Sequence, residues 1–384
     1  MRADEPHLLD LPPMLVLSII ASLLFAGYSL LILVYWRGWT KVPVFDPAQA
    51  PSTSISIIIP ARNESANIGN LLRSIQLQAY PPHLLQVIVI DDHSSDDTAA
   101  IAGTFSFVTV LRLTDTNLNS YKKNAVEKGI ALATGELIIC TDADCIPSPL
   151  WLQTMVGFYE KTGAAFIAAP VMIRPEPSGL ALFQAMDFLV LQGITAASVQ
   201  LNMHAMCNGA NMAYKRSAFY AVEGFKEIDH LASGDDMLLM YKIRRHFPND
   251  IKYLLSKNAI MYTGAQETIG RFFNQRIRWA SKATSYQEKN MLPVLALVYF
   301  FNLLFPVLLI TSVFHEPILW LVMVLWIAKT IVELPFYMTV SGFYNMRWTA
   351  WLLFPFQPFH ILYTVLSGFL GQFRSYEWKG RKVS

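Results

Sequence analysis

Charged side chains are scarce in this sequence. Of its 384 residues, 53% are hydrophobic and 15% are Asp, Glu, Lys or Arg. Soluble domains usually carry about 25% charged residues. The mean hydropathy is +0.35. This composition excludes an ordinary water-soluble domain for the whole chain and indicates a membrane protein.

Cysteine and basic runs are also sparse. The three cysteines, Cys140, Cys145 and Cys207, have no CxxC spacing, which excludes a disulfide framework and a cysteine zinc site. The net charge is +2, and no basic run longer than a few residues occurs before the tail. We therefore expect no nucleic-acid partner. No internal repeat or low-complexity tract is present.

The first long apolar run covers residues 14–36, after an N-terminal arm of residues 1–13. It carries no charge and is long enough to cross a bilayer, so it predicts an uncleaved transmembrane anchor. Arg37 and Lys41 follow it. By the positive-inside rule, the residues after the anchor are expected in the cytoplasm of a multi-pass protein of the cell membrane.

The C-terminal quarter, residues 291–370, predicts two to three further transmembrane segments. Residues 291–314 and 317–340 read as spans, and the second contains Lys329 and Glu333 at a spacing that allows the charges to pair. Residues 348–370 contain Pro355 and Pro358, which we expect to break the helix. Four full spans would place the basic tail, residues 371–384, outside. Residues 348–370 are therefore re-entrant or interfacial, or the positive-inside rule fails for this protein.

Between the anchor and these spans, residues 52–288 have the pattern of an α/β domain. Apolar runs that predict buried strands alternate with amphipathic runs that predict helices, which indicates a mostly parallel sheet. Residues 179–201 predict a long, nearly uncharged helix, which could lie at the membrane surface. The expected strands are 55–59, 86–90, 137–140 and 164–169, and the expected helices are 65–78, 122–133, 179–201, 235–246 and 268–286.

Two carboxylates follow the strand at 137–140. Asp142 and Asp144 are spaced i, i+2, so they would share a side if the chain stays extended. Hard oxygen ligands at a strand's carboxyl end suit Mg²⁺ or Mn²⁺. The alternative for this pair is a solvated acidic turn.

Further polar groups follow the other predicted strands. Pro60 and Glu64 could hold a flat ring, and Asp91 and Asp92 could accept hydrogen bonds from it. Lys122 lies near a predicted helix start, where a diphosphate could bind. Taken singly, these residues fit ordinary helix caps and a solvated face equally well.

These motifs occur in a fixed order: Pro-Ala-Arg-Asn-Glu at 60–64, Asp-Asp-x-Ser-x-Asp at 91–96, Lys-x-x-Ala at 122–125 and Thr-Asp-Ala-Asp at 141–144. The order resembles the nucleotide-binding half of family 2 glycosyltransferases, which have an inverting, Rossmann-like GT-A fold with a mixed, mostly parallel sheet. The resemblance implies a nucleotide-sugar donor, most simply UDP-linked. The expected donor-binding residues are Pro60, Glu64, Asp91, Asp92, Lys122, Asp142 and Asp144, the last two through Mg²⁺ or Mn²⁺.

The lysine segment departs from that family pattern. Tyr121 stands where glycine is usual, and Glu127 stands where asparagine is usual.

The second half of the domain extends the resemblance. Residues 207–214 resemble a segment that lines the floor between donor and acceptor, which implies roles for Gly209 and Asn211. Residues 233–239 resemble the family's acidic motif, and Asp236 aligns with the general base, although Asp235 remains a candidate. For either acid, an ordinary helix cap is the alternative.

The segment Gln275-Arg276-Ile277-Arg278-Trp279 matches the Q-x-x-R-W signature of membrane-bound members such as cellulose, chitin and hyaluronan synthases and ceramide glucosyltransferases. On a helix, Gln275, Arg278 and Trp279 share a face. The resemblance implies that this segment, Arg276 included, contacts the diphosphate and the acceptor. Without the other motifs, it would predict a membrane-interface belt.

Together these features predict a membrane-bound inverting glycosyltransferase that uses a lipid or glycan acceptor at the membrane. Single-sugar transfer to a lipid or membrane-bound acceptor is favoured, because few spans are available to build a channel. A processive polysaccharide synthase is the alternative. A non-catalytic nucleotide-binding scaffold would be expected to have lost one of the acids, and all are present.

Overall fold

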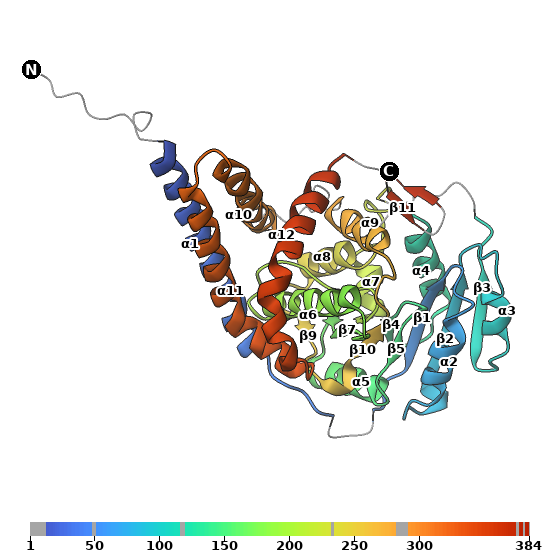
Figure 1. The fold of residues 1–384 in the computed structure, drawn as a ribbon. Helices are drawn as coiled ribbons and strands as arrows, with labels where there is room; N and C mark the ends of the chain where they lie inside the picture. The colour runs from blue at the N-terminus through green and yellow to red at the C-terminus, as the bar shows by residue number, and fades with distance from the viewer. Residues whose placement is uncertain are drawn as a thin grey trace, which may run out of the picture.

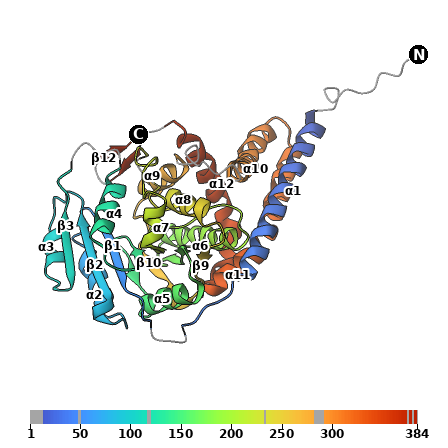
Figure 2. The same cartoon turned by 180° about the vertical axis from the view of Figure 1, so that it is seen from behind.

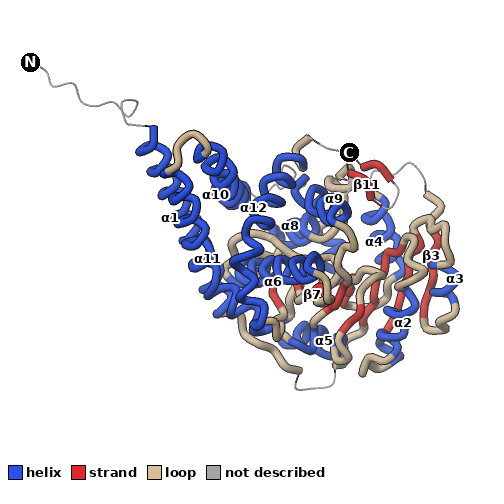
Figure 3. Tube along the Cα trace, viewed as in Figure 1, coloured by secondary structure: helices blue, strands red, loops and turns tan. Residues whose placement is uncertain are grey.

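The computed structural model describes residues 13–47, 51–115, 120–231, 234–281, 291–373, 376–378 and 381–383. The arm before residue 13, the end of the helix predicted to reach residue 286 and several tail positions therefore lie outside the described residues. The strands gather on one side of the molecule, and long helices occupy the other side (Figures 1 and 3).

The main sheet has seven strands in the order β3-β2-β1-β4-β8-β6-β9. Strand β1 pairs in parallel with β2 and β4, whereas β8 runs antiparallel to β4 and β6. This is the mixed, mostly parallel GT-A-like sheet that the motifs predicted. Its strands are β1 Ile55–Ala61, β2 Leu85–Asp91, β3 Val108–Arg112, β4 Leu137–Cys140, β6 Phe166–Ala168, β8 Met212–Lys215 and β9 Ile251–Tyr253.

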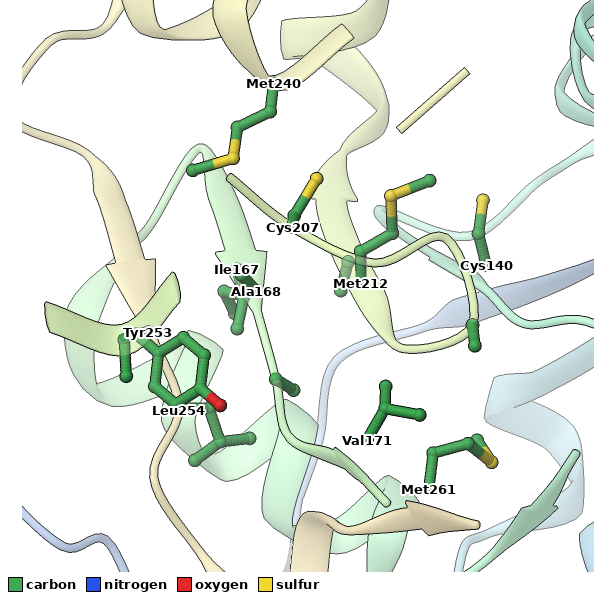
Figure 4. Packing of buried hydrophobic residues seen from close by; sticks show 14 of the residues in the cluster. Cys140, Ile167, Ala168, Val171, Cys207, Met212, Met240, Tyr253, Leu254 and Met261 are labelled. Carbon is green, nitrogen blue, oxygen red and sulfur yellow. The ribbon is translucent and has the colours of Figure 1, made fainter. Parts of the chain in front are cut away.

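Strand β4 lies in the middle of this sheet and is buried along its whole length. Its apolar side chains suit a strand that is covered on both faces. Just before it, Gly135 lies so close to β1 that a Cβ atom would come within 2.4 Å of the Ser56 nitrogen. Glycine is needed there for close backbone approach. Figure 4 shows the adjoining core, where Met212 of β8 pairs with Cys140 and Ala168 on either side.

A second, smaller sheet extends the fold beyond β4. Strand β10 pairs antiparallel with β5 and parallel with β7. The tail forms a two-stranded hairpin. The bounds are β5 Ile146–Pro147, β7 Val171–Ile173 and β10 Met261–Thr263, and β11 Tyr376–Trp378 and β12 Arg381–Val383 for the hairpin.

The helices of the sheet domain are shorter than predicted at several ends. The helix expected at 65–78 begins at Ile68, because the Ser65 nitrogen donates to Asp96 and the Glu64 nitrogen donates to Thr98. These bonds hold the preceding residues in a loop. The helices are α2 Ile68–Gln76, α3 Thr98–Gly103, α4 Tyr121–Leu132, α5 Trp151–Thr162, α7 Arg216–Ala221, α8 Met237–His246 and α9 Ile269–Ala280, with 3₁₀ turns η2 Pro82–Leu84 and η3 Lys257–Ala259.

Helix α6, Gly179–Gln200, is an internal helix and does not simply lie on the surface. It packs against β7 and β9 on the sheet side and against α1 and α11 on the other. Most of it is buried, which differs from the interfacial position considered for residues 179–201. Its apolar side chains are therefore covered by protein on both sides.

Within the part of the chain that the structure describes, five helices are long and apolar enough to cross a membrane, α6 among them. Helix α1 packs alongside α10 and α11, and Figure 2 shows the α1–α11 pair from the opposite side. The other four candidates are α1 Pro13–Thr40, α10 Met291–Ser312, α11 Pro317–Phe343, and η5 Arg347–Leu352 continuing into α12 Leu353–Leu370.

The prolines of the last apolar stretch do not break its helix, contrary to the sequence prediction. Pro355 falls in the first turn of α12, where a missing N–H costs nothing. Pro358 cannot donate to the Phe354 carbonyl, and that carbonyl instead accepts a hydrogen bond from Trp326 Nε1 at 3.2 Å. A side chain from α11 thus satisfies the group that proline leaves open.

Candidate active site

A single cavity of about 1530 Å³ connects the carboxyl ends of β1 and β4 with the apolar helices. Sites in open α/β sheets form at this edge, beyond the strand ends. Its walls include most of the residues predicted from sequence, and Asp91 and Asn211 are absent from them. The predicted residues that line it are Pro60, Glu64, Asp92, Lys122, Asp142, Asp144, Gly209, Asp235, Asp236, Gln275, Arg276, Arg278 and Trp279.

Lys122 stands between the acids of the two half-domains. Its Nζ lies 2.8 Å from Asp142 Oδ1 and 3.2 Å from Asp235 Oδ2. Burial by itself would lower the pKa of the Lys122 amine, but the carboxylates of Asp142 and Asp235 outweigh it and raise that pKa well above its usual range. The site therefore holds a permanent positive charge beside Asp142.

Asp236 is the N-cap residue of α8, so the helix predicted at 235–246 begins two residues later than expected. Its Oδ1 accepts a hydrogen bond from the Met237 nitrogen at 2.7 Å, and its Oδ2 accepts one from the Gly209 nitrogen at 3.2 Å. Both carboxylate oxygens thus accept from backbone N–H groups, and Oδ1 does so at the N-terminus of α8. An ionised carboxylate on a cavity wall is suited to take a proton from a hydroxyl.

The two acids after β4 do not lie on an extended strand. The chain turns at Ala143 and Asp144, and the Cys145 nitrogen donates to the Asp142 carbonyl at 3.2 Å. The expectation of a shared side through extended geometry is therefore wrong, but both carboxylates reach the cavity through the turn. Next to them, burial and then the charge of Asp144 raise the pKa of the Cys145 thiol, so it stays neutral.

The residues fit a divalent cation that takes some of its ligands from the protein and the others from a substrate. Asp142 and Asp144 offer hard oxygen donors, which suit Mg²⁺ or Mn²⁺. Within the described residues, no group of three or more His, Cys, Asp or Glu side chains could hold a metal ion by itself. A cation here would need further oxygens, such as those of a diphosphate.

The acids upstream take different positions. The Asp92 carboxylate contacts His93 Nδ1 at 2.9 Å at the cavity wall. Asp91 is buried at the end of β2, and its Oδ1 has no hydrogen-bond partner among the described residues. The Glu64 carboxylate accepts from Asn67 Nδ2 at 2.8 Å. Glu64 and Asp92 therefore line the cavity, whereas Asp91 does not.

Sequence reasoning missed the role of Asp96. Its carboxylate accepts hydrogen bonds from the Ser65 nitrogen at 3.0 Å and from the Thr98 nitrogen at 3.1 Å. Burial alone would raise the pKa of Asp96, but these bonds and the Thr98 hydroxyl lower it to about 2. Asp96 therefore ties the loop after β1 to the loop after β2.

Asn211 is a structural residue and not a cavity residue, so its predicted acceptor role is wrong. It is fully buried, and its Oδ1 accepts from Trp151 Nε1 at 2.9 Å. Its Nδ2 donates to the carbonyls of Pro170 and Ala259, both at 2.8 Å. Gly209, in contrast, does line the site: a Cβ there would lie 3.4 Å from Lys122 Nζ.

The Q-x-x-R-W segment lies on α9, with Gln275, Arg278 and Trp279 on the cavity wall, as their helical spacing predicted. Arg276 also reaches the wall, but its guanidinium is engaged by the protein. Its Nη2 donates to Asp187 Oδ2 at 2.7 Å, and both side chains are 4% exposed. The guanidinium also stacks over the Trp279 ring at 4.3 Å.

Asp187 is a second residue that the sequence prediction did not assign to the site. Besides Arg276, its carboxylate accepts from the Tyr363 hydroxyl at 2.5 Å. This places α6, α9 and α12 around one buried carboxylate. The only signal in the sequence was that Asp187 is the single charged residue of an otherwise apolar helix.

Comparisons with known proteins agree with this geometry. Residues 56–222 match Glycosyl transferase family 2. A stretch of 230 residues is 29% identical to the poly-beta-1,6-N-acetyl-D-glucosamine synthase of Staphylococcus epidermidis, covering 59% of this chain and 53% of that protein. The chain thus spans about half the length of that relative. Over 316 residues it is 26% identical to the probable glycosyltransferase YdaM of Bacillus subtilis, covering 75% of this chain and 74% of YdaM.

A solved structure shows the same fold. The mannosyltransferase PcManGT from Pyrobaculum calidifontis, in complex with GDP-Man and Mn²⁺, aligns with a TM-score of 0.57 at 19% identity. The alignment covers 93% of this chain and 96% of that one. The family match ends at residue 222, before Asp235, Asp236 and the Q-x-x-R-W helix. Residues 56–222 therefore resemble Glycosyl transferase family 2, and the chain has a GT-A-like α/β fold.

Proposed function

We propose that this protein is a membrane-bound inverting glycosyltransferase that moves a sugar from a nucleotide sugar, UDP-linked in the simplest case, to a lipid or membrane-bound acceptor. The observation that carries the proposal is the single cavity in which Asp142, Asp144, Lys122 and Asp236 meet. The names of the relatives, which include a poly-N-acetylglucosamine synthase, support a nucleotide-sugar donor.

In this proposal, Glu64 and Asp92 face the base and ribose of the donor, and the Lys122 amine binds the diphosphate. Asp142 and Asp144 would hold a Mg²⁺ or Mn²⁺ ion, which supplies charge neutralisation for the departing diphosphate. The structural neighbour that holds Mn²⁺ with its nucleotide sugar supports this assignment. Arg278, which also lines the cavity, adds a second positive charge.

Asp236 acts as the general base. It takes the proton of an acceptor hydroxyl, and the oxygen forms a bond to the anomeric carbon as the bond from that carbon to the diphosphate breaks. The hydroxyl attacks from the face opposite the diphosphate, so one displacement inverts the configuration. Asp235 is occupied by Lys122 at 3.2 Å, which favours Asp236 as the base.

The arrangement of the helices supports three full crossings, with the sheet domain in the cytoplasm. The start of α1 and the α10–α11 connection lie at the end of the bundle that points away from the sheet. The Trp39 ring, near the end of α1, packs on the Phe343 ring of α11 at 5.9 Å, at the opposite end. Helix α12 packs on α9, and β11 also contacts α9. Strand β11 thus lies beside the sheet domain, and the basic residues of the tail favour the cytoplasmic side.

A processive polysaccharide synthase is the second candidate, and one observation favours it. The cavity continues from the predicted donor site along α1, α6, α10, α11 and α12, so the few apolar helices do enclose space beyond the reaction centre. Product length separates the candidates. Purified full-length protein with one labelled donor should give a single-sugar product, and a ladder of products would establish the polymerase.

The first experiment measures thermal unfolding of the full-length protein with UDP, with and without Mn²⁺. Ligand at 100 times its Kd stabilises a folded protein by about 2.7 kcal/mol. We expect UDP to raise the unfolding temperature more strongly with Mn²⁺ than without it. The Asp142→Asn/Asp144→Asn variant should keep its unliganded stability and lose the Mn²⁺-dependent part. No shift under either condition would contradict the proposal.

A further inference from the structure

Polar side chains from three apolar helices meet inside the bundle, far in sequence from the donor motifs. Lys329 Nζ on α11 lies 2.5 Å from Glu333 Oε1 and 2.6 Å from Gln357 Oε1 on α12. Tyr28 on α1 donates its hydroxyl to Glu333 Oε1, and Gln357 Nε2 donates to Glu333 Oε2. We call these four residues the Glu333 cluster. Ionisable groups among membrane helices are costly and usually mark functional sites.

The Glu333 cluster has a closed side and an open side. Lys329 is fully buried, and its side chain is absent from the cavity wall. Tyr28, Glu333 and Gln357 line the same cavity as Asp142 and Asp236, and the Glu333 side chain keeps 14% exposure. Lys329 thus contacts the Glu333 carboxylate from the protein interior, while Glu333 lines the cavity.

The carboxylate retains one position for a further hydrogen bond. A carboxylate offers about four acceptor positions. Among the described residues, Glu333 Oε1 accepts from Lys329 and Tyr28, and Oε2 accepts only from Gln357. The open position is an acceptor, so it suits a ligand that donates. Because Lys329 already balances the charge, a neutral hydroxyl or amide N–H fits better than a second cation.

The wall that α1, α11 and α12 form beside the Glu333 cluster is mostly apolar, although Tyr337 and His360 also line it. It includes Leu31 and Ile32 of α1, Phe336 of α11 and Leu353 and Phe356 of α12. A glycan carries hydroxyls around its whole rim and would leave many of them unpaired against such a wall. A lipid has an apolar body with few polar groups. A few hydrogen-bonding groups in a mostly apolar wall therefore match a lipid better than a glycan.

We propose that the Glu333 cluster binds the acceptor as a neutral lipid, with Glu333 accepting a hydrogen bond from a hydroxyl or amide group of that lipid. The assignment rests on the proposed function in one respect, namely that the occupant of this cavity is the acceptor. The lipid would lie between α11 and α12 within the cavity that reaches Asp236.

The test is photolabelling of full-length protein in phosphatidylcholine nanodiscs. The probe is dioleoylglycerol with a diazirine on one acyl chain, and its matched partner is the same lipid with the free hydroxyl methylated. Labelled peptides are mapped by mass spectrometry. We expect labelling of α11 and α12 next to the Glu333 cluster, and about tenfold weaker labelling there by the methylated lipid, since a hydrogen bond to a charged group is lost.

Two variants and one control sharpen this test. Lys329→Met/Glu333→Leu replaces the ion pair by apolar residues of similar volume, which buried pairs often tolerate. We expect it to lose the preference for the free hydroxyl. Glu333→Gln, which keeps the side-chain shape, should reduce that preference if the double variant does not fold. Ile331→Ala, at a position of the same helix that is 62% exposed, should label as the unmodified protein does.

Equal labelling by both lipids in the unmodified protein would overturn the assignment, and so would an unchanged preference in the double variant. Displacement of the label by a soluble N-acetylglucosamine tetramer would show that a glycan occupies the cavity, which also overturns it. The unfolding experiment with UDP decides the proposed function separately. If UDP raises the unfolding temperature but labelling shows no preference for the free hydroxyl, the proposed function stands and the lipid assignment is rejected.

Discussion

The Lys122 amine lies 2.8 Å from Asp142 and thereby joins the two halves of the site. Lys122 lies in the first turn of α4 in the first half of the domain, and its amine also reaches Asp235, which precedes α8 in the second half. One positive charge thus holds acids that are far apart in sequence near each other. This arrangement makes Lys122 the residue on which donor binding should depend most directly.

Lys122→Met should weaken donor binding about 10- to 100-fold, because a hydrogen bond between charged groups contributes about 1.5–3 kcal/mol. The change should appear in the KM for the nucleotide sugar and in the Kd for UDP. Since the pKa of Lys122 is raised well above its usual range, its contribution should not vary between neutral and mildly alkaline pH. The control is Lys128→Met on the same helix, where the lysine is exposed and lies 3.6 Å from Asp115. Equal effects of the two substitutions would contradict the assignment.

Asp236→Asn should reduce transfer by about 10² to 10⁴, the usual contribution of a general base. The amide can still cap α8 and accept from the Met237 nitrogen, so UDP binding should change little. Product formation and UDP-induced stabilisation are measured on the same preparation. Asp235→Asn is the comparison, and it should weaken UDP binding because Asp235 contacts Lys122. Retained turnover in Asp236→Asn would remove this residue from the mechanism.

The buried pair of Asp187 and Arg276 gives a stability prediction. Asp187→Ala should destabilise the protein by about 3–5 kcal/mol, because it leaves a buried guanidinium without its partner. The double change Asp187→Leu/Arg276→Met should recover most of this loss. The control is the exposed pair of Arg271, on α9, and Glu267, just before that helix, where Glu267→Gln should cost about 1 kcal/mol or less. Thermal unfolding measures the stability of all three variants. A double variant that is no more stable than Asp187→Ala would argue against an energetic coupling between Asp187 and Arg276.

The buried His204 should make the stability of the folded protein depend on pH. Burial, with a smaller contribution from Arg244, lowers its pKa from 6.5 to about 4. The folded state thus keeps His204 neutral, while the unfolded chain takes up a proton below 6.5. The contribution to stability is complete above pH 6.5 and is lost as the pH falls towards 4, by about 3 kcal/mol in total.

His204→Gln, which keeps polar atoms near Tyr35 and Ser198, should flatten this acid-side loss. His83→Gln, at an exposed position, should leave the slope unchanged. Unfolding temperatures measured between pH 4 and 8 test the prediction. An unaltered slope in the His204 variant would show that other groups cause the loss.

Much of the sheet could be predicted because its signals are local. The run Leu137–Cys140 is apolar at every position, and the structure has a strand over those residues. The i, i+3, i+4 spacing of Gln275, Arg278 and Trp279 likewise predicted one shared helix face, and all three reach the cavity. The spacing of apolar residues indicates which face of a helix or strand is buried. Such predictions therefore do not require knowledge of the element that packs against that face.

The wrong predictions concern residues whose surroundings are determined by hydrogen-bond partners far away in the chain. Asn211 carried a motif, but its polar atoms are all used by Trp151, Pro170 and Ala259. Pro358 predicted a broken helix, but Trp326 satisfies the carbonyl that it leaves open. No local pattern contains these partners, because each lies more than 20 residues away in the chain.

From the residue pattern alone we predicted four strands of the main sheet, the long apolar helices, the acids Asp142, Asp144 and Asp236, and the resemblance of their motifs to one family. Only the tertiary structure decided that Lys122 bridges Asp142 and Asp235, that Arg276 turns to Asp187, and that Glu333 faces the same cavity as the acids. The physical reason is that charges in a low-dielectric interior must find partners, and the fold, not the spacing, brings those partners together.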